Sequence, residues 1–316
     1  MWGRNRLRLA FYVGYFDSEY TKELHAGILK FCNENDVELL TFIAGEVGDN
    51  ENGMNYQNLA AASLVSDKNV DGILFATGTQ LNYVGPEYIL SYLKSFKPLP
   101  VVSIGYAFQS IESVLSDCST GLKELIVHLI KEHGCQKMLF MGASVNSQEG
   151  NDREKVFRDT LKANKIAVDE KMILHGNFSY SSAYDALTEF YEKNPKKKID
   201  AIVAANDDMA YACIDYLHAH GLRVPDDIIV TGFDDNKRSS YTIPTLSTVN
   251  QSIQQQGYAA AEVLYKILNK KKTKRLIKIP TKAVFRQSCR CLGQNEAFTE
   301  DGKKTTVKSI AISAVA

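Results

Sequence analysis

Polar side chains that could bind a small molecule stand directly after two apolar runs of the sequence. Asn206 and Asp207 follow the run at residues 201–205, and Asp234 follows the run at residues 228–232. Carboxylate and amide groups form hydrogen bonds with hydroxyl groups, as donors, acceptors or both. If both runs are parallel strands of one sheet, their carboxyl ends open onto the crevice where such sheets bind ligands.

A cation and aromatic rings occur at comparable positions. Arg153 stands near the start of a predicted helix after the apolar run at residues 137–141, and Phe16 and Asp17 follow the run at residues 9–13. A guanidinium group forms paired hydrogen bonds, and an aromatic face stacks on a flat ligand. Each residue also has a structural interpretation, as a helix cap, a turn residue, a surface charge or a core ring. Their recurrence at several equivalent positions favours ligand binding.

Catalytic and metal-binding patterns are missing from the sequence. We find no phosphate loop, no G-x-S-x-G turn and no H-E-x-x-H helix, and no pair of nucleophile and base. We therefore predict that the protein is not an enzyme and has no cofactor. The close pair Cys289 and Cys291 could hold a metal only with two further ligands. The sequence identifies none, so we predict no metal site.

Apolar runs alternate with amphipathic segments along the chain. Strands are predicted at residues 9–13, 37–43, 72–76, 100–104, 137–141, 172–175, 201–204, 228–231 and 276–279, and helices at 20–35, 56–68, 86–96, 121–133, 152–164, 181–194, 208–219 and 254–269. This alternation is typical of parallel sheets with crossover helices. Because the strands are too many for one compact sheet, we predict an α/β fold of two doubly wound parallel-sheet lobes.

Composition limits the partners and the location of the protein. The 316 residues include 37 Lys and Arg and 37 Asp and Glu, so the formal charge is zero, which argues against a dedicated nucleic-acid-binding domain. The basic run at 270–275 is interpreted as an exposed turn. No apolar stretch is long enough for a membrane span, and no clean signal peptide begins the chain. Together with six scattered cysteines, this predicts a cytoplasmic protein that does not contact membranes.

The chain resembles the sensor domain of the lac repressor and purine repressor family over residues 7–292. The resemblance is most specific in the sequences NDDMA at 206–210 and GLRVPDDIIVTGFDD at 221–235. It is weaker in the first half, where VDGIL at 70–74 and PVVSIG at 100–105 fit the same pattern.

The resemblance implies a periplasmic-binding-protein-like type I fold, with two lobes joined by three crossovers. The N-terminal lobe would comprise residues 7–134 and 249–272, the C-terminal lobe residues 135–248 and 273–292, and the tail 293–316 would be a linker or disordered. By position in the family pattern, Arg153, Asn206 and Asp234 would contact a ligand, and Phe178 would stack on a sugar. The ligand would be a sugar or nucleobase-like molecule, and the protein a homodimer.

The resemblance also predicts a function. A ligand that closes the cleft between the lobes would signal to a transcriptional regulator of the lac repressor type. The first predicted strand begins at residue 9, so we expect no helix-turn-helix before it, and DNA contact only through a domain not present in this chain. The alternative is a sensor for a separate or truncated output: a diguanylate cyclase, a histidine kinase or an AraC-type regulator. A transport-type binding protein is disfavoured because no signal peptide is evident.

Overall fold

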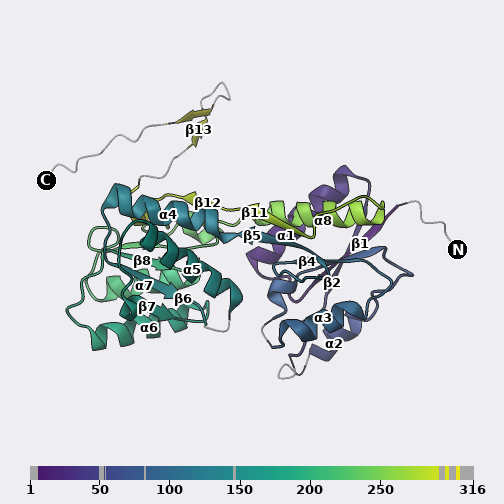
Figure 1. The fold of residues 1–316 in the computed structure, drawn as a ribbon, viewed down its shortest axis with the longest axis horizontal. Helices are drawn as coiled ribbons and strands as arrows, with labels where there is room; N and C mark the ends of the chain where they lie inside the picture. Colours follow the sequence, from purple (N-terminus) through teal and green to yellow (C-terminus); the bar gives the residue numbers. More distant parts are fainter. Residues whose placement is uncertain are drawn as a thin grey trace. The chain divides into compact units, whose positions relative to one another are not determined.

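The computed structural model describes residues 6–49, 53, 55–81, 83–144 and 147–291, and the backbone of 296–298 and 304–306. Of residues 59 and 61, only the backbone is described. The chain forms two compact units: unit 1 comprises Met1–Asp117 and Ser252–Ile279, and unit 2 comprises Cys118–Gln251 and Pro280–Ala316. The chain therefore passes between the units three times. Each unit is a sheet with helices packed on it (Figure 1), which confirms the predicted α/β fold class.

Unit 1 is built on a six-stranded sheet with the order β11-β5-β4-β3-β1-β2. The strands are β1 (Arg8–Val13), β2 (Glu38–Ile43), β3 (Gly72–Phe75), β4 (Val101–Ile104), β5 (Glu112–Asp117) and β11 (Leu276–Pro280). Strands β1 to β5 pair in parallel, with Phe11 opposite Thr41 on one side and Leu74 on the other. Strands β1, β3 and β4 are buried, and buried parallel strands carry apolar residues on both faces, so their sequences are near-continuous apolar runs.

The two faces of this sheet have separate cores. Leu9, Phe11 and Val13 pack with α1 (Glu19–Glu34) and α8 (Ile253–Leu268), whereas Ala10 and Tyr12 pack on the opposite face, where α2 (Asn55–Ala62) and α3 (Pro86–Lys94) lie. Successive strand residues point to opposite faces, so β1 contributes to both cores. The two cores together exclude water from both sides of β1.

Helices α1 and α8 approach each other closely at two glycines. A Cβ atom on Gly27 would lie 1.9 Å from the carbonyl oxygen of Gln254, and one on Gly257 would lie 2.1 Å from that of Leu24. Both distances are far below van der Waals contact. The backbones of α1 and α8 therefore meet directly, without a side chain between them.

Unit 2 is built on a four-stranded parallel sheet with the order β7-β6-β8-β9. The strands are β6 (Met138–Gly142), β7 (Ile173–His175), β8 (Ala201–Ala204) and β9 (Ile229–Thr231). Helix α4 (Cys118–His133) packs beside α5 (Gln148–Ala163), and α6 (Tyr180–Lys193) packs beside α7 (Asp207–Ala219). A separate antiparallel pair joins β10 (Thr248–Asn250) to β12 (Lys282–Val284).

The unit boundaries differ from those predicted. The first crossing falls between residues 117 and 118 rather than near 134, because Leu122, Leu125 and Leu129 of α4 belong to the core of unit 2. The second falls at 251 and 252, close to the predicted 248 and 249. The third follows residue 279 rather than 272, because β11 lies beside β5 in the sheet of unit 1.

Some elements also differ from prediction. Strands β5, β10 and β12 were not predicted, because β5 (ESVLSD) is mostly polar and β10 and β12 have only three residues each. Helix α2 ends at Ala62 rather than residue 68, since the Asn69 side chain bonds to the backbone of Leu64 and Ser66 and forms a turn there. The basic run 270–275 is the largely exposed connection between α8 and β11, as predicted.

The tail was predicted to be a linker or disordered. Within it, β13 (Glu296–Phe298) pairs antiparallel with β14 (Lys304–Thr306), which corrects the prediction for those six residues. The other residues from 293 to 316 lie outside the described residues. Within the described part of the chain, none of the helices has both the length and the apolar composition that crossing a membrane requires.

Candidate ligand-binding site

The loops at one edge of the unit 2 sheet bring together most of the predicted site residues. Strands β6, β8 and β9 are parallel neighbours, so their carboxyl ends lie at the same edge. Arg153 lies on α5 after β6, Asn206 follows β8, and Asp234 follows β9. This edge is where open α/β sheets bind ligands.

Arg153 is a buried cation held by the start of α5. Ser147 caps this helix by accepting a hydrogen bond from the Gly150 amide at 3.1 Å. Only 2% of Arg153 is exposed. Its Nη1 donates to the carbonyl oxygen of Ala205 at 2.5 Å, and its Nη2 donates to Glu149, one helical turn earlier. Among the described residues, its Nε has no hydrogen-bond partner, which leaves one buried donor available.

Two aromatic rings enclose this guanidinium group. The Arg153 Cζ atom lies 3.9 Å from the ring centroid of Phe233 and 5.5 Å from that of Phe178. Both distances are within the range of cation–π attraction. Phe178 is only half-buried, so part of its ring can contact another molecule. The predicted aromatic and the predicted cation are therefore neighbours.

Asp234 supplies a carboxyl group next to Arg153. Its Oδ1 atom lies 3.9 Å from Arg153 Nη2 and accepts a hydrogen bond from Gln251 Nε2 at 2.5 Å. Burial raises the pKa of Asp234 to about 7, although the positive charge of Arg153 opposes that shift. The side chain keeps 31% exposure, so solvent offsets part of this effect. Asp234 is thus an accessible acid whose charge can change near neutral pH.

Asn206 holds the backbone beside Phe178. It caps α7, with Oδ1 accepting from the Met209 amide at 3.0 Å, and its Nδ2 donates to the Phe178 carbonyl oxygen at 2.9 Å. Phe178 itself has φ of 65°, an uncommon backbone conformation for a residue with a large side chain. The Asn206 side chain therefore positions the aromatic ring, in addition to any ligand contact.

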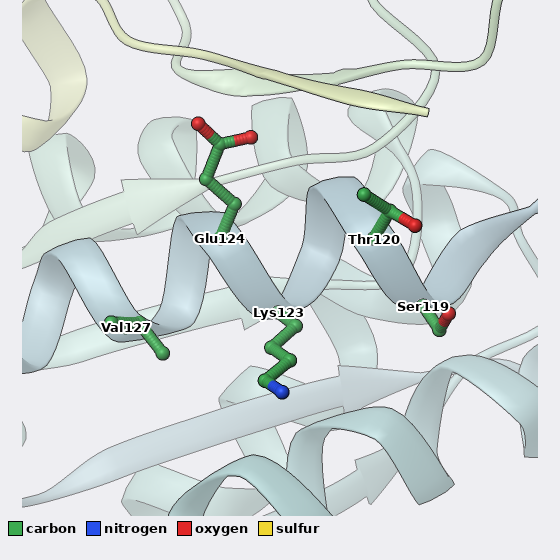
Figure 2. Close-up of a pocket in the computed structure, with 5 residues that line it drawn as sticks. All are labelled: Ser119, Thr120, Lys123, Glu124 and Val127. Atoms are coloured by element: carbon green, nitrogen blue, oxygen red, sulfur yellow. The ribbon is translucent and has the colours of Figure 1, made fainter. Parts of the chain in front are cut away.

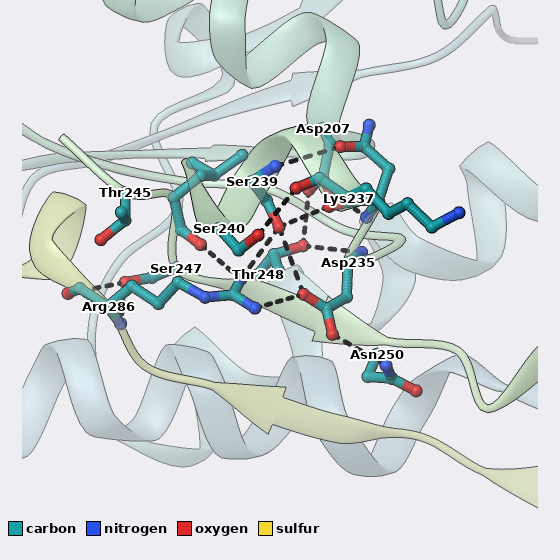
Figure 3. A network of polar contacts seen from close by, with 12 residues as sticks. Asp207, Asp235, Lys237, Ser239, Ser240, Thr245, Ser247, Thr248, Asn250 and Arg286 are labelled. Atoms are coloured by element: carbon teal, nitrogen blue, oxygen red, sulfur yellow. Dashed lines mark hydrogen bonds and ion pairs between the residues drawn. The ribbon is translucent and has the colours of Figure 1, made fainter. Parts of the chain in front are cut away.

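Asp207 supports the loop that follows β9, and its predicted ligand contact stays a prediction. Its side chain is fully buried; Oδ1 accepts from Thr248 Oγ1 at 2.5 Å and Oδ2 accepts from the Asn236 amide at 2.9 Å (Figure 3). A Cβ atom on Gly232 would lie 2.2 Å from Asp207 Oδ1, so only glycine fits there. Burial, together with the nearby Asp234, raises the pKa of Asp207 well above its ordinary value.

A second charged group fixes the loop that carries Asp234. Arg286 Nη2 donates to Asp235 Oδ1 at 2.7 Å, and Asn250 Nδ2 donates to Asp235 Oδ2 at 2.8 Å (Figure 3). Arg286 also donates to the Leu246 carbonyl oxygen and to Ser239. The roles of Arg286 and Gln251 could not be predicted from the sequence, because their partners Asp235 and Asp234 are far away in the chain. Glu149 could have been found from its spacing of four residues before Arg153.

Phe16 and Asp17 lie in unit 1, after β1. The Phe16 ring packs edge-on against His25 with 5.1 Å between centroids, as part of the unit 1 core. Asp17 is exposed, and its carbonyl oxygen accepts a hydrogen bond from Lys22 Nζ at 2.7 Å. Much of the Phe16 ring therefore packs in the core of unit 1, as in the alternative structural interpretation of this residue. The predicted ligand contacts of Phe16 and Asp17 stay predictions.

A hollow of about 490 Å³ lies along α4 rather than at the sheet edge. Its lining side chains, Ser119, Thr120, Lys123, Glu124 and Val127, all come from that one helix (Figure 2). An enclosed ligand site needs groups that converge from several elements. This hollow lacks them, so we place the candidate site at Arg153 and Asp234.

The cysteine pair has histidine neighbours that sequence analysis did not identify. The metal-binding atoms of His128, His133, Cys289 and Cys291 all lie within 4.8 Å of one another. The histidines are on α4 and the cysteines follow β12, more than 150 residues later. Only the fold brings the two pairs together.

Comparison with known proteins supports the architecture. The sequence model of the family described as "Periplasmic binding protein-like domain" matches residues 127–289, just over half of the chain. This chain belongs to that family of periplasmic binding protein-like domains. One curated relative is the HTH-type transcriptional repressor PurR of Proteus mirabilis (strain HI4320), 27% identical over 232 residues. The alignment covers 72% of this chain and 66% of that relative. The chain therefore spans just under two thirds of the length of PurR.

Two solved structures of the same fold are regulators in complex with a small molecule. The lac repressor dimer bound to operator and the anti-inducer ONPF has a TM-score of 0.73 at 19% identity, covering 91% of this chain and 82% of that one. The complex of the transcriptional regulator CelR with cellobiose has a TM-score of 0.71 at 22% identity, covering 90% and 85%. These values show that the periplasmic binding protein-like fold is shared.

Proposed function

We propose that this chain is the sensor domain of a transcriptional regulator of the lac repressor type, and that it binds a sugar or nucleobase-like molecule at Arg153, Asp234 and Phe178. The observation that carries the proposal is the buried guanidinium of Arg153. It keeps an unpaired Nε donor among the described residues and lies beside the partly exposed carboxyl group of Asp234. An unpaired donor on a buried charged group is costly unless a ligand satisfies it.

The donors and acceptors of this site match a hydroxylated ligand. Arg153 donates hydrogen bonds, Asp234 accepts them when ionised, and the Phe178 ring offers an apolar face. One hydroxyl group of a sugar can accept a hydrogen bond from Arg153 while the adjacent hydroxyl group donates one to Asp234. A nucleobase, with its flat ring and its own donors and acceptors, suits the same groups, and the panel below separates the two classes.

Signalling would follow if the ligand binds the closed arrangement of the two units more tightly than the open one. In our proposal the ligand also engages unit 1 through the loop of Phe16 and Asp17, and so favours a closed arrangement of the two units. The relatives reported above are regulators of transcription, which supports this output over a separate cyclase or kinase. We assign DNA binding to a domain outside this chain and no catalytic role to the site.

A thermal-shift screen tests the proposal. Purified protein is heated with monosaccharides, disaccharides, sugar phosphates, nucleosides and purine bases. A ligand that binds only the folded state raises Tm in proportion to the logarithm of its concentration above Kd. We expect at least one compound class to do so. No shift across the panel in a protein with a cooperative melt would contradict the proposal.

Matched arginine variants then locate the site. Arg153→Met should weaken binding of the active compound by about 10- to 100-fold, the usual effect of losing a charged hydrogen-bond donor. Arg158→Met is the control, because Arg158 lies on the same helix and pairs with Glu170 at 2.6 Å and with Glu154 at 2.7 Å. Equal losses in both variants would place the ligand elsewhere.

A further inference from the structure

The cluster of His128, His133, Cys289 and Cys291 contains four metal-binding side chains in one place. His128 Nε2 lies 3.1 Å from His133 Nε2 and 3.1 Å from Cys291 Sγ, and His133 Nε2 lies 3.6 Å from Cys291 Sγ. The fourth donor, Cys289, is completely buried and lies within 4.8 Å of the other three. None of these residues belongs to the proposed ligand site.

These separations match the edges of a small tetrahedron. Zinc binds sulfur at about 2.3 Å and nitrogen at about 2.0–2.1 Å, which places two nitrogens about 3.3 Å apart and a nitrogen and a sulfur about 3.6 Å apart. The observed 3.1 and 3.6 Å differ from these values by half an ångström or less. A cation could therefore bind His128, His133 and Cys291 with sub-ångström movements of their side chains. Cys289 lies within 4.8 Å of the other three donors, so its sulfur would move by up to about 1 Å to reach the roughly 3.8 Å that separates two thiolates on zinc.

From this geometry we propose that His128, His133, Cys289 and Cys291 form a structural zinc site. Two thiolates balance the double charge of the ion and two neutral imidazoles complete the set, so the loaded site carries no net charge. All four positions are filled by protein, as in closed structural sites rather than catalytic ones. The histidines have the H-x4-H spacing typical of such sites, while C-x-C is shorter than the usual cysteine spacing.

The backbone explains how so short a cysteine pair can converge. Arg290, between the cysteines, has φ of 64°, a left-handed conformation that turns the chain. Its Nη2 donates to the Asp226 carbonyl oxygen at 2.9 Å, and the amides of Cys289 and Cys291 both donate to the Arg286 carbonyl oxygen. These bonds fix the turn without help from a metal.

The helix side of the site is also held in place. The Phe285 ring packs on the His128 imidazole with 4.0 Å between centroids. His128 and His133 occupy the last turns of α4. A metal here would link residues 163 positions apart and fasten the closing segment of unit 2 to α4. We therefore expect zinc to raise Tm, because the link is made only in the folded state.

Cobalt(II) titration of the full chain tests the site. Protein purified under reducing conditions and stripped with a chelator is titrated with Co²⁺ alone. We expect the visible bands of tetrahedral cobalt and a thiolate charge-transfer band, both saturating at one equivalent and both removed by Zn²⁺. A folded protein with reduced thiols and no such bands at equimolar cobalt would overturn the proposal, as would a Cys289–Cys291 disulfide in that preparation.

Variants identify the ligands. Cys291→Ser and His128→Gln should each abolish the cobalt bands, while the controls Cys213→Ala and His218→Gln, both on α7, should keep them. Bands that persist in both ligand variants would refute the assignment.

If a variant of a proposed metal ligand fails to fold, alkylation of the wild-type thiols tests the site instead. Zinc should protect Cys291 from alkylation and leave the labelling of half-buried Cys118 unchanged. Equal labelling of Cys291 with and without zinc would also refute it.

Discussion

The Asp234 carboxyl group and the Arg153 guanidinium group lie 3.9 Å apart at the carboxyl edge of the unit 2 sheet. Arg153 has a closer carboxylate partner in Glu149. Asp234 therefore gains only part of the stabilisation that a nearby cation can give to its ionised form, and burial dominates its pKa. Asp234 and Arg153 are therefore neighbours without a direct hydrogen bond to each other.

The raised pKa of Asp234 predicts a pH dependence of stability. Burial raises the pKa of Asp234 in the folded protein to about 7, from the ordinary value of 3.8 that applies in the unfolded chain. Between these values the native state binds more protons, so stability falls as pH rises. Asp207 acts in the same direction. We expect Asp234→Asn to flatten the decline of Tm between pH 4 and pH 7, without abolishing it.

The control for this experiment is Asp226→Asn, because the Asp226 side chain is 61% exposed. It should leave the pH dependence of Tm unchanged. A wild-type decline that Asp234→Asn does not reduce would mean that the Asp234 carboxyl group ionises normally in the folded protein.

At the scale of the helices and strands, the sequence predicted most of what positions the site. The apolar runs of β6, β8 and β9 are buried on both faces, and the polar residues after them mark the loops. The unit boundary was missed because the apolar residues of α4 show that it packs on something, but not on which sheet. The bond from Asp207 to the buried Thr248 could not be predicted, because a carboxylate after a strand has the same sequence signature whether it faces a ligand or a buried threonine.

The contact between α1 and α8 gives a prediction about stability. Gly27→Ala would place a methyl group against the backbone of Gln254, so the helices must separate. We expect a loss of about 1–3 kcal/mol in the free energy of unfolding, as for overpacked cores. Urea denaturation measures it.

Gly85→Ala is the matched control, because a Cβ atom there would have no heavy atom within 4 Å. It should change stability by a smaller amount, set by its position as the N-cap of α3. Equal losses of stability in both variants would show that the close approach of α1 and α8 is not the reason why Gly27→Ala destabilises the protein.

At the scale of the whole molecule, the family resemblance predicts a homodimer. Unit 1 carries several large apolar side chains that are at least 36% exposed, among them Leu40, Ile43, Tyr56, Leu64 and Tyr88 on or next to β2, α2 and α3. Analytical ultracentrifugation should therefore report about twice the chain mass of 35.2 kDa.

Ile43→Asp should shift this equilibrium toward monomer, because burying an unpaired carboxylate in an interface is costly. Leu276→Asp on β11 is the control and should stay dimeric, since Leu276 is similarly exposed at 41% but on the opposite edge strand of the sheet. A monomeric wild type at high concentration would contradict the predicted assembly.

The central claim, that ligand binds at the carboxyl edge of the unit 2 sheet, is tested most directly by hydrogen–deuterium exchange with the compound selected by thermal shift. We predict slower exchange in peptides covering residues 147–153, 176–179 and 232–236, which carry Arg153, Phe178 and Asp234. Peptides covering residues 167–172 and 196–198, which include residues that line a hollow at the opposite edge near Lys137, should be unchanged. Protection confined to that opposite edge, or to α4, would contradict the account.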